Sequence, residues 1–436
     1  MAIATALATL VALGLWAVFA RPAPEPAEPV PTILPPPPST TAVEPTTFEP
    51  SVIILADGTE IASIRDGGAL VSLRGHNALV DFLLRRLVDD PEFWAEDGDG
   101  SRALGLSPAR DTGLTVRLTI DPAVQEIVEE AIGRWLDDPE TFISVVVIDN
   151  ETGGVLAAGP ASQITGEVFY PERRLPAGSL AQVYTTVAAL EAGMSLDSTW
   201  DASSPQTFTS EDWPDEWTVR NAGTSRPPIT LEQALYQAVN TVFAAVGIEV
   251  GPEAVIDSAT RLGANLTGTE TAEPPPAVAI GAGTLDTFDA TAMFSTLSRE
   301  GVLARPTLVE SITNADGDVL YEAPRAREVT VDPQVVAQVR QPLREVTTIR
   351  GTAGLALSGF DQSLEPIGKT GTAQEFTNAW YVGSTDRYTV AVAVGATDGA
   401  SLVDVEFNGQ LYARVFGGSV PAPIWAEIVS ELYGMP

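Results

Sequence analysis

The sequence predicts an α+β protein in which helices cover an antiparallel sheet, and three observations support this. The apolar run 144–149 is followed by a short turn and a second apolar run at 155–158, which is typical of a hairpin. Two more strands are predicted at 367–374 and 388–394, and we expect them to pair with each other. Apolar residues recur at helical spacing before the first pair and again at 421–432. Strands that return on themselves between amphipathic helices indicate a layered α+β arrangement.

Several predicted elements begin at recognisable signals. Asp121 and Pro122 form an N-cap with proline at the first helical position. Ser179 opens a helix that runs to Gly193. A capping box at 230–233 starts another helix. The other predictions are a hairpin of 52–55 and 60–64, a helix at 79–87, a strand at 115–120, an apolar helix ending near 248, helices at 287–299 and 331–346, and a strand at 307–313.

Composition limits the classes of partner and cofactor. The chain has 58 acidic and 24 basic residues, a formal charge of -34. Phosphate binding needs a basic face, so this charge argues against nucleic acid as a partner. There is no cysteine, and His76 is the only histidine. We therefore expect no thiolate or multi-histidine metal site and predict no cofactor.

The N-terminal part is predicted to lie outside the globular body. Residues 1–20 form an uncharged apolar run that is long enough to span a hydrocarbon core of about 30 Å, so we predict a single transmembrane anchor. A cleaved signal peptide is the alternative, because the run ends in a small-residue pattern. Both interpretations place the rest outside the cytoplasm, and the anchor would hold it at the cell membrane. Residues 21–50, rich in Pro, Glu and Thr, are a predicted linker. A small segment at 51–113 and a main domain at 114–436 follow.

The most informative stretch contains Lys369, the only lysine in the chain, followed by Thr370, Gly371 and Thr372. Lysine is a compact point charge that fits a narrow cleft. A glycine lets a ligand approach the backbone closely, and two threonine hydroxyls can bind a carboxylate. This pattern predicts a substrate-binding strand.

From about residue 114 onward the sequence resembles the transpeptidase domain of penicillin-binding proteins, a family recognised by the motifs S-x-x-K, S-x-N and K-T-G. The resemblance implies the fold shared with serine β-lactamases, in which a helical subdomain lies beside the sheet. It also implies peptidoglycan stem peptides or β-lactams as ligands, with proteins of cell-wall synthesis as candidate partners. Two stretches are similar to the bifunctional class A branch, but 51–113 is too short for a glycosyltransferase domain. The matching landmarks lie in collinear order at 119–125, 147–153, 177–179, 188–193, 240–243, 279–283, 350–353, 368–374 and 417–425.

Two of the three motifs depart from the family pattern. The first reads Ser179-Leu180-Ala181-Gln182, so the serine remains but glutamine replaces the lysine. A primary amide has no basic nitrogen near neutral pH, so Gln182 cannot act as a general base. The second reads Ala238-Val239-Asn240, so the serine hydroxyl is missing and only Asn240 carries over.

These departures leave two main functional hypotheses, and a β-lactam-sensing or purely structural module is the remaining alternative. The first is a membrane-anchored pseudo-transpeptidase of cell-wall metabolism, in which Ser179, Gln182, Asn240 and Lys369 line a cleft that binds but does not turn over its ligand. The second is an active serine D,D-transpeptidase or carboxypeptidase acylated at Ser179, with Lys369 or a water held by Gln182 as the base. Ser179 could also serve only as a helix N-cap.

Overall fold

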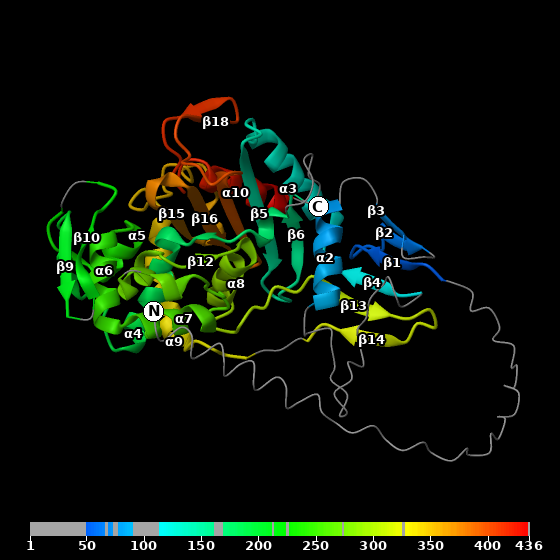
Figure 1. Cartoon of the computed structure of the whole chain (residues 1–436), viewed down its shortest axis with the longest axis horizontal. Coiled ribbons are helices and arrows are strands. Elements are labelled where there is room, and N and C mark those ends of the chain that lie inside the picture. The colour runs from blue at the N-terminus through cyan, green and yellow to red at the C-terminus, as the bar shows by residue number, and fades with distance from the viewer. Residues whose placement is uncertain are drawn as a thin grey trace, which may run out of the picture. The chain divides into compact units, whose positions relative to one another are not determined.

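The computed structural model describes residues 49–65, 69–72, 77–89, 113–160, 169–211, 213–223, 226–272, 274–324 and 328–434 (Figure 1). The predicted anchor and the linker up to residue 48 lie outside these ranges. Within them, no helix is both long and apolar enough to cross a bilayer.

A five-stranded antiparallel sheet lies at the centre of the main domain, in the order β15-β16-β17-β5-β6. The α+β prediction is therefore confirmed. Every residue of β16 and β17 is buried, and β5 is buried except at its last residue. Val, Ile and aromatic residues dominate these strands, which suits a sheet packed on both faces. Their bounds are β5 Thr141–Asp149, β6 Val155–Gly159, β15 Ile367–Thr372, β16 Asn378–Ser384 and β17 Tyr388–Ala396.

The predicted pairing of the Lys369 strand with 388–394 is wrong. β15 pairs with β16, and β17 lies one strand further into the sheet. The five residues between Thr372 and Asn378 suffice to reverse the chain, so β16 is the hairpin partner of β15. The run 378–383 has the composition of a buried strand, which is the signal that could have identified β16 from the sequence.

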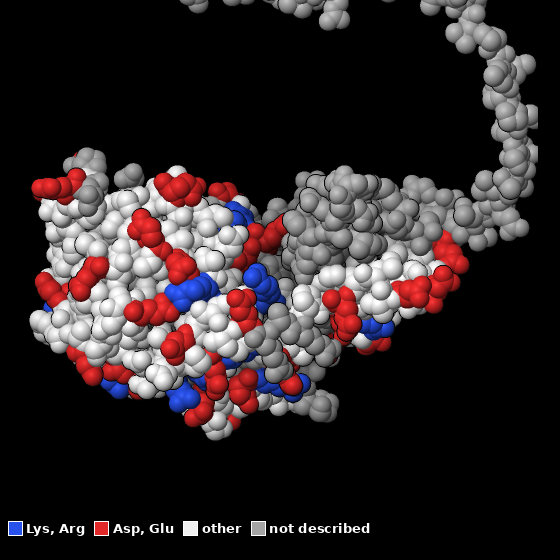
Figure 2. All heavy atoms as spheres, turned by 90° about the horizontal axis from the view of Figure 1, so that it is seen from below, with Lys and Arg blue, Asp and Glu red and all other residues white. Residues whose placement is uncertain are grey.

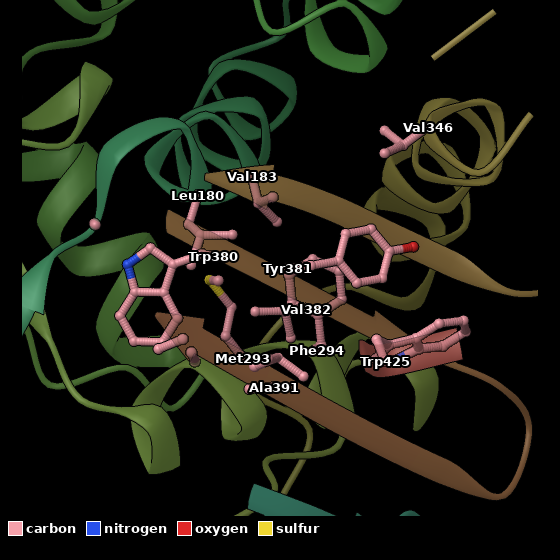
Figure 3. Packing of buried hydrophobic residues seen from close by; sticks show 14 of the residues in the cluster. Leu180, Val183, Met293, Phe294, Val346, Trp380, Tyr381, Val382, Ala391 and Trp425 are labelled. Carbon is pink, nitrogen blue, oxygen red and sulfur yellow. The ribbon is translucent and has the colours of Figure 1, made fainter. Parts of the chain in front are cut away.

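Helices cover both faces of this sheet. On one face of β16, Tyr381 and Gly383 contact Trp425 of α10 (Pro421–Gly434). On the opposite face, Trp380 donates a hydrogen bond from Nε1 to the backbone oxygen of Pro176. Figure 3 shows Met293 and Phe294 of α8 (Thr287–Ser298) on the Trp380 and Val382 side of β16, and Trp425 apart from them. The sheet is therefore the buried middle layer of the domain.

The predicted helix starts are present. The Asp121 side chain accepts hydrogen bonds from the backbone N–H groups of Ala123 and Val124, with Pro122 in the first turn of α3 (Pro122–Trp135). The capping box of Thr230 and Gln233 begins α5 (Leu231–Tyr236). The helical subdomain consists of α4 Ala181–Glu191, α5, α6 Asn240–Val250, α7 Pro252–Arg261 and α9 Pro333–Val346.

A second sheet has six strands in the order β14-β13-β4-β1-β2-β3. The predicted hairpin of 52–55 and 60–64 is confirmed as β1 and β2, and β1 also pairs in parallel with β4. Strands from both sides of position 113 thus share one sheet. The bounds are β1 Ser51–Ile54, β2 Glu60–Arg65, β3 Ala69–Ser72, β4 Thr115–Leu118, β13 Val309–Thr313 and β14 Val319–Glu322, with α2 (Asn77–Asp89) between β3 and β4.

Short elements complete the described chain. The two-stranded sheets are β7 Leu175–Pro176 with β12 Thr284–Leu285, β8 Thr199–Trp200 with β11 Ile229–Thr230, β9 Gln206–Ser210 with β10 Trp213–Val219, and β18 Val405–Phe407 with β19 Gln410–Tyr412. Acidic side chains are dispersed over the face in Figure 2 rather than gathered in one patch.

Candidate active site

Ser179 lies in η4 (Gly178–Leu180), a single 3-10 turn that leads directly into α4. Its side chain is partly exposed and forms no helix-capping hydrogen bond, so the N-cap interpretation of Ser179 is not supported. Gly178 has a φ of 51°, and a Cβ atom there would lie 2.7 Å from the backbone oxygen of Thr372. A glycine is required at this point, because any larger residue would push η4 away from β15.

The segment before Ser179 is held firmly against the sheet. The backbone oxygen of Pro176 accepts hydrogen bonds from Trp380 Nε1 at 3.0 Å and from Asn378 Nδ2 at 3.1 Å. Both donors belong to β16 and are fully buried. Leu180 and Trp380 lie together in the core, as Figure 3 shows. These contacts fix the position of Ser179 relative to β15.

Gln182, one helical turn after Ser179, is completely buried. Its Nε2 donates a 3.0 Å hydrogen bond to Oδ1 of Asn240, whose Nδ2 donates at 3.3 Å to the backbone oxygen of Arg220. The carbonyl of Arg220 can only accept, so it sets the orientation of both side-chain amides. The arrangement leaves Gln182 Oε1 buried without a hydrogen-bond partner among the described residues. An unsatisfied buried acceptor costs about 1–3 kcal/mol.

Ala238 lies between α5 and α6, where the family motif has its serine. Its φ is 54°, in the left-handed region that few non-glycine residues adopt. The next turn is held by Asn221, whose Oδ1 accepts from the backbone N–H of Thr241 at 2.9 Å and whose Nδ2 donates to Thr241 Oγ1 at 3.0 Å. Asn240, the first residue of α6, is thereby placed beside Gln182. Nothing in the sequence around Asn221 indicates this role.

Lys369 is fully buried in β15, and its Nζ donates a 3.0 Å hydrogen bond to the backbone oxygen of Thr370. No carboxylate lies within ion-pairing distance of Nζ among the residues that the structure describes. Burial lowers the pKa of Lys369 to about 7, because the ammonium loses its hydration and gains no counter-ion. Near neutral pH the side chain therefore divides between the ammonium and the amine.

The predicted substrate-binding residues lie beside Lys369 on the same strand. Thr370 Oγ1 lies 2.6 Å from Thr352 Oγ1, and Thr372 Oγ1 accepts a 3.3 Å hydrogen bond from the backbone N–H of Gly417. A Cβ atom at Gly371 would lie 3.1 Å from Leu180 Cγ, so the strand and η4 are in contact there. The fold thus brings Ser179 beside the Thr372 end of β15, and a separate hydrogen bond brings Gln182 to Asn240.

The site also includes residues that lie outside the three motifs. Thr352 and Gly417 belong to two stretches noted only for their similarity to class A proteins, and both contact the Lys369 strand. Only the tertiary contacts reveal that Thr352 and Gly417 both lie beside the Lys369 strand.

Comparison with known proteins identifies the family. Residues 143–430 match the model of the penicillin binding protein transpeptidase domain. The chain is 30% identical over 332 residues to penicillin-binding protein 1A of Mycobacterium tuberculosis, covering 72% of this chain and 39% of that protein. It is 28% identical over 333 residues to penicillin-binding protein 1A of Mycolicibacterium smegmatis, covering 72% of this chain and 40% of that protein. This chain therefore spans about two fifths of each of these relatives.

A solved structure gives the same result. The PonA1 protein from Mycobacterium tuberculosis in complex with penicillin V superposes with a TM-score of 0.63 at 25% identity, covering 74% of this chain and 87% of that one. The matched region contains η4, α4, α6 and β15, which carry every predicted site residue. The chain belongs to the penicillin-binding protein transpeptidase family.

Proposed function

We propose that this protein is a membrane-anchored pseudo-transpeptidase, which binds peptidoglycan stem peptides or β-lactams in a transpeptidase-type cleft without efficient acyl transfer. One observation carries the proposal: the side chain at the general-base position is the Gln182 amide, and its nitrogen is a hydrogen-bond donor to Asn240. A positioned general base typically contributes about 10²- to 10⁴-fold in rate. Ser179 without one is a weak nucleophile.

The binding part of the proposal rests on groups that remain accessible. Ser179, Asn240 and Thr372 are partly exposed, so a ligand can reach them. The backbone of Thr372 lies against Gly178, beside the nucleophile position. The N–H groups of Ser179 and Thr372 are candidates for an oxyanion hole, and Thr370 and Thr372 are candidates for binding a carboxylate.

An active D,D-transpeptidase or carboxypeptidase is the second candidate, and Lys369 is the observation in its favour. A buried lysine with a pKa of about 7 is partly unprotonated at neutral pH and could serve as a base. In this case Ser179 would form a covalent acyl-enzyme.

One experiment separates the two candidates. The full chain is mixed with a fluorescent penicillin, and anisotropy is recorded before the protein is denatured and its intact mass measured. We expect saturable anisotropy without a mass adduct. A stoichiometric adduct that disappears in Ser179→Ala but persists in Ser358→Ala would refute the pseudoenzyme and support the active enzyme. Unchanged anisotropy at all concentrations would refute ligand binding.

Membrane anchoring by residues 1–20 is a separate part of the proposal, supported by their uncharged apolar composition. It places the main domain outside the cytoplasm, where cell-wall synthesis proteins would be candidate partners. The full chain should sediment with membranes, while the chain from residue 21 onward should not. Recovery of the full chain in the soluble fraction would contradict an uncleaved anchor.

A further inference from the structure

A groove of about 500 Å³ lies along helix α9, and its lining side chains are not among the predicted site residues. Gln334, Ala337, Arg340, Gln341 and Arg344 recur at helical spacing and present one face of α9 to it. The buried residues of α9, such as Val339 and Leu343, belong to the core instead. The groove thus lies along the polar side of α9, and the opposite side of this helix packs in the hydrophobic core.

The charged residues that line this groove are two arginines, Arg340 and Arg344, and one carboxylate, Glu300. Arg344 has a carboxylate partner, Glu365, at 3.2 Å, but both side chains are exposed and such pairs contribute little to stability. Arg340 is half-buried, and the part of the chain that the structure describes offers its guanidinium neither a hydrogen bond nor an ion pair. A chain with 58 acidic and 24 basic residues could supply a carboxylate for every arginine. Among the described residues, Arg340 is therefore a partly desolvated cation without a hydrogen-bonded or ion-paired partner.

The charges around Arg340 indicate which kind of ligand would suit the groove. Burial and the neighbouring charge of Arg344 lower the pKa of Arg340, while Glu300 and Glu365 partly oppose this. An oxyanion between the two guanidinium groups would offset the desolvation and the repulsion together, and the planar fork of arginine matches phosphate or carboxylate geometry. Glu300 also lines the groove and can only accept hydrogen bonds when ionised, which favours a ligand that carries hydroxyl or ammonium donors as well.

We propose that the α9 groove is a second binding site, for a small oxyanion or a polymer segment that bears a phosphate-type group next to hydroxyl donors. Arg340 and Arg344 would hold the oxyanion, and Gln334 and Gln341 would bind the neighbouring polar groups. This site is independent of Ser179 and of the proposed pseudoenzyme function.

The test measures calorimetric binding of glycerol 3-phosphate to the full chain at low salt, with inorganic phosphate and uncharged glycerol as comparisons. We expect saturable binding of both phosphates, weakened at least tenfold by Arg340→Gln and by higher ionic strength. Arg117→Gln changes another partly buried arginine, on β4, and should leave binding unchanged. Vesicles of phosphatidylglycerol distinguish a lipid headgroup from a free phosphate as the source. Equal binding by wild type and Arg340→Gln, or no saturable binding of either phosphate, would overturn the proposal.

Thermal unfolding tests the same site by a second method, with and without phosphate. Arg340→Met keeps the apolar stem and removes the charge, so it should raise Tm in the absence of anions. Saturating phosphate should raise the Tm of the wild type by at least about 2 °C and leave the variant unchanged. A lower Tm for Arg340→Met in phosphate-free buffer would show that Arg340 is already satisfied, and would refute the site.

Discussion

At the scale of single residues, the site departs from the family motifs at two side chains, Gln182 and Ala238. Gln182 has lost the basic nitrogen, and Ala238 has lost the hydroxyl of the neighbouring motif. The amide of Gln182 is held by Asn240, which is held in turn by the backbone of Arg220. The replacement is therefore integrated into a hydrogen-bonded chain, and we expect that reversing it needs more than one substitution.

This leads to a prediction about restored acylation. Gln182→Lys should give only slow labelling of Ser179 by penicillin, because Ala238 still offers no hydroxyl. The double variant Gln182→Lys/Ala238→Ser should label at least about tenfold faster, within the range of general-base effects. Intact-mass time courses measure both rates. Equal rates for the single and double variants would show that Ala238 is unimportant.

Lys369 predicts a pH dependence of stability. Its pKa is about 7 when folded and 10.5 in its ordinary state, so the unfolded chain binds an extra proton between these values. Stability should therefore rise with pH from about 7 towards 10.5, by up to about 1.4 kcal/mol per pH unit, while the full penalty remains below pH 7. Urea unfolding of wild type and Lys369→Met between pH 7 and 9 isolates this slope. A difference between the two proteins that does not vary with pH would contradict the lowered pKa.

At the scale of elements, close backbone approach decides where Ser179 lies. Gly178→Ala should destabilise the protein through both its positive φ and the contact with Thr372, and should abolish penicillin binding. Gly193 is a matched control, because its φ is 88° but a Cβ there would meet nothing within 4 Å. Gly193→Ala should lose only about 1–2 kcal/mol and keep binding. Equal losses of stability and equal binding in both variants would show that the η4–β15 contact is unimportant.

Helix starts provide a second prediction at this scale. Asn221 accepts a hydrogen bond from the backbone N–H of Thr241 in the first turn of α6, and Thr230 caps α5. Replacing either with alanine should lower stability by about 1 kcal/mol. Only Asn221→Ala should also weaken ligand binding, because Asn221 holds the backbone of Thr241 and thereby positions the adjacent Asn240 in the site. Denaturant unfolding and penicillin anisotropy on both variants test this. Equal ligand affinity in the two variants would show that Asn221 does not position the ligand-binding residues.

At the scale of the whole molecule, the charge of -34 acts on stability. The carboxylates are spread over the face in Figure 2, so their mutual repulsion is long-range and is screened by salt. Tm should therefore rise as sodium chloride increases from about 0.01 M to about 0.5 M, a range over which the Debye length falls severalfold. Glucose at matched osmolality is the control. A Tm that falls across this range would indicate that attractive ion pairs outweigh the repulsion.

Local signals in the sequence determined much of the fold. The caps at Asp121 and Thr230 and the apolar periodicity of the helices and strands depend on neighbouring residues, so they can be read without tertiary contacts. The motif residues Ser179, Asn240 and Lys369 are recognised differently, through a resemblance to a family, and the family match confirms that resemblance. The replacement of lysine by Gln182 was likewise visible in the sequence alone.

Only the tertiary structure decided what these residues contact. Strand pairing joins segments far apart in the chain, so β16 was missed as the partner of β15. The link from Gln182 through Asn240 to Arg220 joins α4, α6 and the residue that follows β10, and the burial that lowers the pKa of Lys369 comes from the packed sheet. Residue type sets which chemistry a side chain can perform, whereas its proton affinity and its partners depend on the solvent and atoms that folding removes or supplies.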